Sequence, residues 1–328
     1  MPRETPLQGS SGNRRFADVA ALAGMVDGES SRLLLLGAVV GVIGGTAAGG
    51  YDLLRLVAGE FLLGTAEPSL GVDSLWRASL APVAGGLFAG VMIWAATTRS
   101  LPTGISDVVK GVALAEGKLS ARDGVVTAVA AAAVVGTGQS GGREGPIVQL
   151  AASLSSALVS RFELPPRRVR ALVAAGAAAG IAASFNAPLG AAFFAMEVLL
   201  GTFALEAFAP IVVATVVGTV VGQALLGERL AFRLPAFTID SPKELLLYPV
   251  LGVFCGLVAI AMKSGMRRSE TLIDRLSTPL ALRPVLGGIG VAIAALAGFS
   301  AVMGNGYGFV EALIAGREVG VGWLAAVL

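Results

Sequence analysis

The sequence predicts an all-α, polytopic membrane protein built as a bundle of helices, several of them interrupted. Three observations support this fold class: 55% of the 328 residues are apolar, only 14% are charged, and the mean hydropathy is +0.79. Soluble domains carry far more charge. The apolar residues also lie in long blocks, which match a hydrocarbon core ~30 Å thick at about 1.5 Å of rise per residue. Several blocks are therefore expected to span or enter a bilayer.

The expected helices follow these apolar blocks in chain order. They fall at residues 33–63, 78–98, 124–137, 146–160, 169–184, 188–204, 207–226, 245–264 and 284–303. The 45 glycines suit such a bundle, because small residues let helix backbones approach closely where lipid supplies no hydrophobic drive. Some blocks are too short to span, and Gly and Pro clusters join them at 102–104, 136–146 and 186–188. Interrupted helices at membrane depth must be buried in protein or line a watery cavity, so these joints are where we look for function.

Residues 1–32 are polar and charged and lack the apolar centre of a signal peptide, so we expect a cytoplasmic segment there.

Composition excludes several other classes of protein. The net charge is only +2 and no basic run has interleaved aromatics, so no nucleic-acid partner is predicted. The single cysteine, Cys255, can form neither an intrachain disulfide nor a multi-cysteine metal site. No cofactor is predicted.

The most informative segment is the glycine-rich run from Gly136 to Pro146. It contains a GxGxxG pattern, but no strand precedes it, so dinucleotide binding is not indicated. It also contains the GxSxG and GxSG patterns of serine hydrolases and intramembrane proteases, with Ser140 as the nucleophile. Both need a histidine partner, and the chain contains no histidine. An enzyme is therefore not predicted.

The same segment leads into an apolar helix, with Pro146 near the first turn, where its missing N–H does no harm. Such a helix start offers free backbone N–H groups and the positive end of the helix dipole. An anion is stabilised there without a full positive charge, which would bind it too tightly to let it leave. Glu144 is a tethered anion at this start, which a free anion or a proton could displace. The alternative is a carboxylate that only caps its helix.

Three motifs resemble signatures of the CLC family of chloride channels and chloride/proton exchangers. The first is GREGP at residues 142–146. The second, SFNAPL at 184–189 with its continuation from Phe194 to Glu197, is similar to the family's FNAPLAG…F..E segment. The third, LPTGISD at 101–107, is similar to its GSGIPE motif. Their order and spacing match those of the family.

The resemblance implies tilted, partly broken helices in two inverted repeats, the first at 33–226 and the start of the second at 245–328. It implies a homodimer in the lipid bilayer of the cell membrane, with one pore in each subunit. Chloride or a similar small anion would be transported, with protons as a second substrate in an exchanger. Glu144 would be the outer gating glutamate. The implied anion-binding positions are Thr103, Gly104, Ile105, Gly142, Arg143, Gly145 and Pro146. Arg143 could raise the local anion concentration or pair with a lipid headgroup.

Some positions depart from the family pattern. Pro102 replaces the first glycine of GSGIPE and Ser106 replaces its proline, which alters backbone freedom beside the central site. Thr103 keeps a hydroxyl that can donate to an anion. Exchangers typically carry a glutamate after the position of Glu197, but Val198 stands there and cannot carry a proton. Glu197 is the candidate proton carrier, with a structural helix carboxylate as the alternative. Channel and exchanger both stay open.

The last part of the chain leaves further alternatives. Gly304–Phe309 contains the GYG of potassium filters without the preceding Thr-Val, and its position resembles a glycine-rich loop early in the family's second repeat, so we expect a loop. The chain stops at Leu328, before the family's GxFxP motif and late tyrosine, so we expect an incomplete second repeat and a fragment of a longer transporter. The alternatives are a fluoride or nitrate transporter of the same fold, a cation pathway, and a non-transporting fragment that assembles with a partner.

Overall fold

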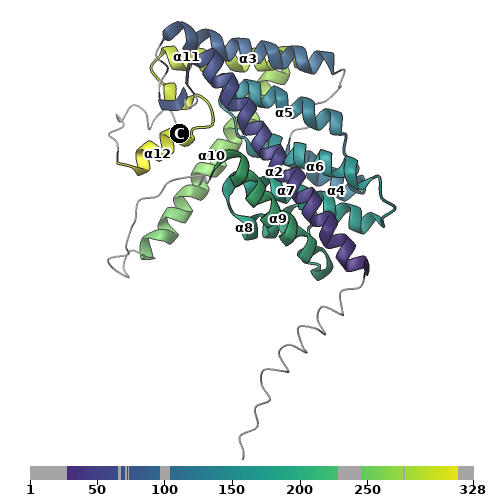
Figure 1. Cartoon of the computed structure of the whole chain (residues 1–328). Coiled ribbons are helices and arrows are strands. Elements are labelled where there is room, and N and C mark those ends of the chain that lie inside the picture. Colours follow the sequence, from purple (N-terminus) through teal and green to yellow (C-terminus); the bar gives the residue numbers. More distant parts are fainter. Residues whose placement is uncertain are drawn as a thin grey trace, which may run out of the picture.

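A computed structural model describes residues 28–65, 68–70, 72, 74–96, 104–227, 245–275 and 278–316. All regular elements in these ranges are helices (Figure 1), so the all-α fold class is confirmed. The helices are α2 Gly28–Leu63, α3 Leu75–Ala95, α4 Ile105–Leu114, α5 Ala121–Gly136, α6 Glu144–Val159, α7 Pro166–Phe185, α8 Pro188–Phe194, α9 Leu205–Leu226, α10 Leu247–Arg275, α11 Arg283–Leu296 and α12 Tyr307–Ile314. Shorter helical turns are η1 Pro68–Leu70, η2 Ala195–Leu200, η4 Leu280–Leu282 and η5 Ser300–Val302.

Five of the described helices are long and apolar enough to cross a membrane. They cover Ser31–Leu63, Leu75–Ala95, Pro166–Phe185, Glu206–Leu225 and Leu247–Arg275. Shorter apolar helices occupy Pro188–Leu200 and Leu280–Leu296. The chain therefore combines full-length spans with short helices, as a multi-pass membrane protein of broken helices requires.

Helix α2 packs against α9 along a row of small residues. Gly37, Gly41 and Gly45 are four residues apart, so they share one face of α2. A Cβ on any of them would lie 2.6 or 2.7 Å from a backbone oxygen of α9. Such close approach is possible only without a side chain, which confirms that glycine serves helix contact in this chain.

The main group of helices consists of α2, α6, α7 and α9. Helix α7 lies at its centre and packs on the other three. Its middle is made almost entirely of buried alanine and glycine, from Leu172 to Ala182. The helix ends at Asn186, whose φ of 54° is left-handed, and Pro188 then starts α8. The side chain of Gln223 in α9 donates to Oδ1 of Asn186 at 2.7 Å. The predicted break at 186–188 is therefore confirmed.

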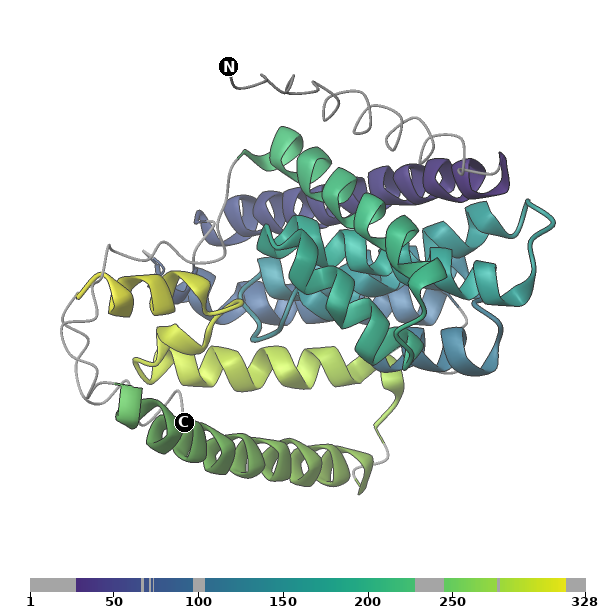
Figure 2. The same cartoon turned by 90° about the horizontal axis from the view of Figure 1, so that it is seen from below.

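A second group of helices is formed by α3, α5 and α11. Helix α3 packs on both of the others. Gly86 and Gly90 of α3 face the backbone oxygens of Pro284 and Ala281 at the start of α11 and in η4. Helix α10 differs, because none of its residues is buried, and Figure 2 shows it along the edge of the bundle. An apolar helix with no buried face is suited to contact lipid or further protein.

Some boundaries differ from the predictions. Helices α4 and α12 were not expected, because they are short and the hydropathy pattern favours long blocks. The loop predicted at 304–309 is wrong from Tyr307 onward, since Gly306, with a φ of 73°, precedes a helix at that point. Helix α10 continues past residue 264 to Arg275, because the charged residues there end the apolar block without ending the helix. Residues 1–27 and Thr103 lie outside the described residues, and the division into repeats stays a prediction.

Candidate functional site

The N-termini of α4 and α6 meet. Gly104 precedes α4 with a φ of 87°, a region that favours glycine, and Glu144 is the first residue of α6. A Cβ on Gly104 would lie 2.9 Å from the Cα of Gly145, so the two backbones are in contact. Ile105 and Pro146 lie in the first turns of the same two helices. Both starts offer unpaired N–H groups and partial positive charge, which suits an anion.

The glycine-rich loop between α5 and α6 is fixed by the buried side chain of Gln139. Its Nε2 donates to the backbone oxygen of Pro82 in α3 at 2.7 Å and to that of Pro284 in α11 at 3.0 Å. At the start of the loop, the hydroxyl of Thr137 donates back to Ala133 at 2.8 Å. The loop is therefore attached to three helices, and the position of Glu144 follows from these attachments.

A second glycine-rich segment, before α12, pairs with this loop through the backbone. The N–H of Gly304 donates to the oxygen of Gly138 at 2.9 Å, and the N–H of Gly141 donates to the oxygen of Gly304 at 3.2 Å. The fully buried Met303 packs with Leu63 beside the same contact. These bonds bring the start of α12 beside the start of α6.

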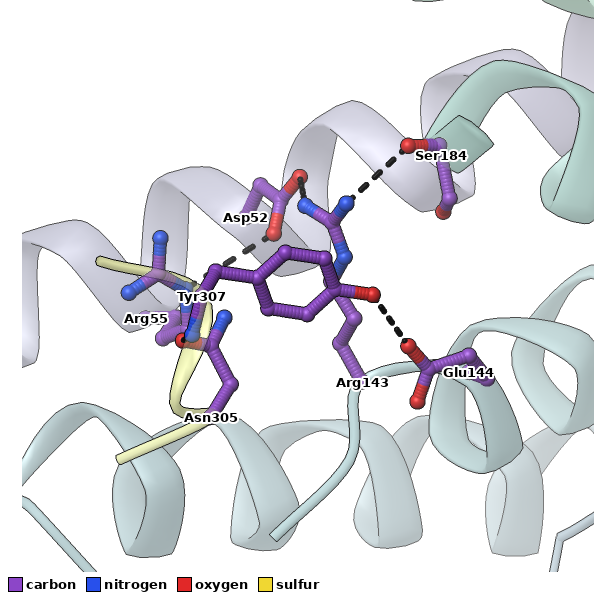
Figure 3. Close-up of polar contacts among 7 residues, drawn as sticks. All are labelled: Asp52, Arg55, Arg143, Glu144, Ser184, Asn305 and Tyr307. Atoms are coloured by element: carbon purple, nitrogen blue, oxygen red, sulfur yellow. Dashed lines mark hydrogen bonds and ion pairs between the residues drawn. The ribbon is translucent and has the colours of Figure 1, made fainter. Parts of the chain in front are cut away.

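Tyr307, the first residue of α12, contacts Glu144 directly. Its hydroxyl donates to Oε1 of Glu144 at 2.8 Å, although the two residues are 163 positions apart (Figure 3). The other carboxylate oxygen lies near Gly142, where a Cβ would come within 2.5 Å of Oε2. Sequence reasoning missed Tyr307, because the segment was interpreted as a loop. The only local signal was a tyrosine directly after a glycine at a helix start.

Arg143 turns toward α2 and α7. Its Nη1 lies 3.2 Å from Oδ2 of Asp52, its Nη2 donates to the oxygen of Ser184 at 3.0 Å, and its guanidinium lies 4.7 Å from the ring centroid of Tyr307 (Figure 3). Asp52 also lies 3.7 Å from Nε of Arg55. Both terminal nitrogens of Arg143 therefore interact with protein groups.

Asp52 and Arg55 are buried charges that the sequence reading did not single out. Each is only 6% exposed. Charged residues inside the apolar block at 33–63 were the available signal, because ionisable groups at membrane depth are rarely placed there without a partner. Asp52, Arg55, Arg143 and Glu144 together form a group of two carboxylates and two guanidinium groups, and their formal charges sum to zero.

The family follows from the comparison of the sequence with known families. Residues 85–328, most of the chain, match the family described as "Voltage gated chloride channel". The chain belongs to this family. A ClcB-like protein of Ralstonia nicotianae is 34% identical over 243 residues, covering 73% of this chain and 56% of the relative. Chloride channel protein CLC-f of Arabidopsis thaliana is 32% identical over 291 residues, covering 80% of this chain and 36% of the relative.

The chain thus spans about half, or less, of the length of these two relatives. Among solved structures, a slow cyanobacterial Cl⁻/H⁺ antiporter superposes with a TM-score of 0.71 at 20% identity, covering 86% of this chain and 67% of that one. A CLC-type fluoride/proton antiporter gives 0.75 at 23% identity, covering 89% and 72%. These likenesses show the fold, and the predicted CLC-like helix bundle is confirmed.

Glu197 lies outside the group around Glu144. It belongs to η2, a π-helical turn that continues α8, and its side chain is exposed. Val198, beside it, is 41% exposed. Of the predicted site residues, the described structure brings Gly104, Ile105, Gly142, Arg143, Glu144, Gly145 and Pro146 together and leaves Glu197 on a separate element.

Proposed function

We propose that this chain forms part of a chloride pathway in which Glu144 is the gate. The observation that carries the proposal is the contact of two helix N-termini at Gly104 and Gly145, with a carboxylate on the first residue of one of them. Neutral N–H donors and helix dipoles can hold a chloride ion and still release it. Glu144 carries the same charge as chloride, so it competes for the same donors until an anion or a proton displaces it.

Chloride is the anion that the relatives favour. Curated relatives of this chain are named as chloride channels, whereas one solved structure of the same fold is described as a fluoride/proton antiporter. Fluoride and nitrate are therefore the competing anions to test. We also propose, from family membership, that two copies assemble in the cell membrane and that each holds its own pathway.

Channel conduction and chloride/proton exchange differ in one measurable quantity, which is uphill proton movement driven by a chloride gradient. Val198 cannot carry a proton, and Glu197 beside it is exposed. Proton uptake that depends on Glu197 would support exchange. Chloride flux without proton movement would support a channel.

The test is chloride efflux from liposomes that contain the purified protein, with and without a proton gradient. Glu144→Gln is expected to change the efflux rate and its pH dependence, because it removes the charge and keeps the shape. Glu206→Gln is the matched control, since the side chain of Glu206 is 82% exposed at the start of α9. Unchanged efflux and pH dependence in Glu144→Gln would remove the gating role. No efflux from the folded unmodified protein would favour the non-transporting alternative.

A further inference from the structure

We propose that Tyr307 is a positioning residue for the Glu144 gate, with its phenolic O–H holding the carboxylate on the α12 side. This inference rests on the proposed gating role of Glu144. Tyr307 is far from Glu144 in the sequence. If its hydroxyl positions the carboxylate, the gate depends on the contact between the starts of α6 and α12.

The hydrogen bond itself has good geometry. The distance of 2.8 Å between the Tyr307 hydroxyl and Oε1 of Glu144 lies within the usual range for O–H···O bonds. A bond to an ionised carboxylate is stronger than one between neutral groups. Both side chains are only partly accessible, so water competes less for the carboxylate than it would at an open surface.

The position of Tyr307 is fixed by several other contacts. Its backbone N–H donates to Oδ1 of Asn305 at 3.3 Å, and its ring lies under the guanidinium of Arg143 (Figure 3). Upstream, Gly304 pairs with the glycine-rich loop that carries Glu144. Donor and acceptor are therefore held by the same pair of loops, which favours a built contact over a chance encounter of two mobile side chains.

The chemical nature of the donor suits a gate. Arg143, next to Glu144 in the sequence, is paired with Asp52 and with the oxygen of Ser184. The phenol bonds the carboxylate as a neutral group. A bidentate guanidinium pair would hold the carboxylate more strongly and hinder its exchange with a free anion. A phenol stabilises one position of the carboxylate and still releases it when the anion leaves or when a proton arrives.

Removing the hydroxyl should therefore change how strongly Glu144 competes with the anion. Without the phenol, the carboxylate turns more often toward the N–H groups at the starts of α4 and α6. There it opposes chloride, so more chloride is needed for the same occupancy. At saturating chloride the anion outcompetes the carboxylate in either case, so the maximal flux should change less.

The experiment compares Tyr307→Phe with the unmodified protein in liposomes. Phenylalanine keeps the ring beside Arg143 and removes only the O–H. We expect the half-saturating chloride concentration to rise roughly threefold or more, the change that one net hydrogen bond produces, with maximal flux within about twofold on the same scale. Tyr248→Phe is the matched control, because Tyr248 is exposed on α10. It should change neither quantity.

The same change in the Glu144→Ala background decides how Tyr307 acts. If the phenol works through the carboxylate, Tyr307→Phe has no effect once the carboxylate is gone. An equal effect in both backgrounds, or an unchanged half-saturation in Tyr307→Phe, overturns the inference. Calorimetric titration of chloride onto the detergent-solubilised protein gives the same comparison without transport. If Glu144→Ala itself leaves flux, pH dependence and binding unchanged, the gating proposal fails first and this inference fails with it.

Discussion

Nη1 of Arg143 lies 3.2 Å from Oδ2 of Asp52, and this ion pair joins the start of α6 to α2. The two side chains are 13% and 8% exposed, so both charges are largely removed from water. A buried pair is costly to form, but removing one partner is worse, because the remaining charge is left uncompensated. The pair therefore fixes the residue that directly precedes Glu144.

Asp52→Asn tests this role of the ion pair. The substitution keeps the shape and removes the charge that balances Arg143, so we expect a loss of about 3 kcal/mol in stability, at the lower end of the cost for breaking a buried pair. The measurement is the thermal unfolding midpoint of the protein in detergent. Glu206→Gln is the control, since it breaks the exposed pair with Arg167 and should cost less than about 1 kcal/mol. Equal shifts in the two variants would contradict the prediction.

Gly104→Ala tests the contact between the two helix starts. The φ of 87° strains any residue with a side chain, and the new Cβ would lie 2.9 Å from the Cα of Gly145. Helix α4 must therefore shift away from α6, and misplaced groups at such a site lower activity by roughly tenfold or more. Chloride flux in liposomes is the measurement. Gly252→Ala on α10 is the control, because nothing lies within 4 Å of its Cβ. Flux that matches the unmodified protein would show that the contact is not needed.

Much of the fold could be predicted because the bilayer restricts helix length and composition. The block at 169–184 appears as α7, Pro166–Phe185, and the block at 78–98 appears as α3, Leu75–Ala95. Helix α4 was missed because Ser106, Asp107 and Lys110 interrupt its apolar residues within ten positions. Hydropathy alone does not distinguish such a short helix of mixed composition from a loop.

The site was predictable only where a local rule applied. Glu144 followed from a glycine-rich loop before an apolar helix, which depends on neighbouring residues. Tyr307 depends on the pairing of Gly304 with Gly138, a backbone contact between two distant loops. No periodicity or spacing in one sequence reveals such a contact, because every residue type except proline can supply both a backbone N–H and an oxygen.

Gln139→Leu tests the attachment of the glycine-rich loop. Leucine has a similar size but cannot donate to the oxygens of Pro82 and Pro284, so α3, α11 and the loop lose their shared donor. We expect a stability loss of about 1–3 kcal/mol, the cost of leaving buried groups unpaired. The midpoint of thermal unfolding measures it. Gln149→Leu is the matched control, because that buried amide donates to Ser153 of the same helix at 3.3 Å. A larger loss in Gln149→Leu than in Gln139→Leu would count against the proposed attachment.

Gly41→Ala and Gly50→Ala together test the contact between α2 and α9, because they place the same side chain on two faces of α2. At Gly41 the new Cβ would lie 2.6 Å from the oxygen of Ala214 and 3.0 Å from Cβ of Val217, so α2 and α9 must separate. Inserting a group into a packed contact costs about 1–3 kcal/mol. At Gly50 nothing lies within 4 Å, and alanine is the better helix former, so no loss is expected. Thermal unfolding of both variants measures the difference. Equal midpoints would mean that α2 and α9 do not depend on backbone contact, and that the glycines of α2 have another role.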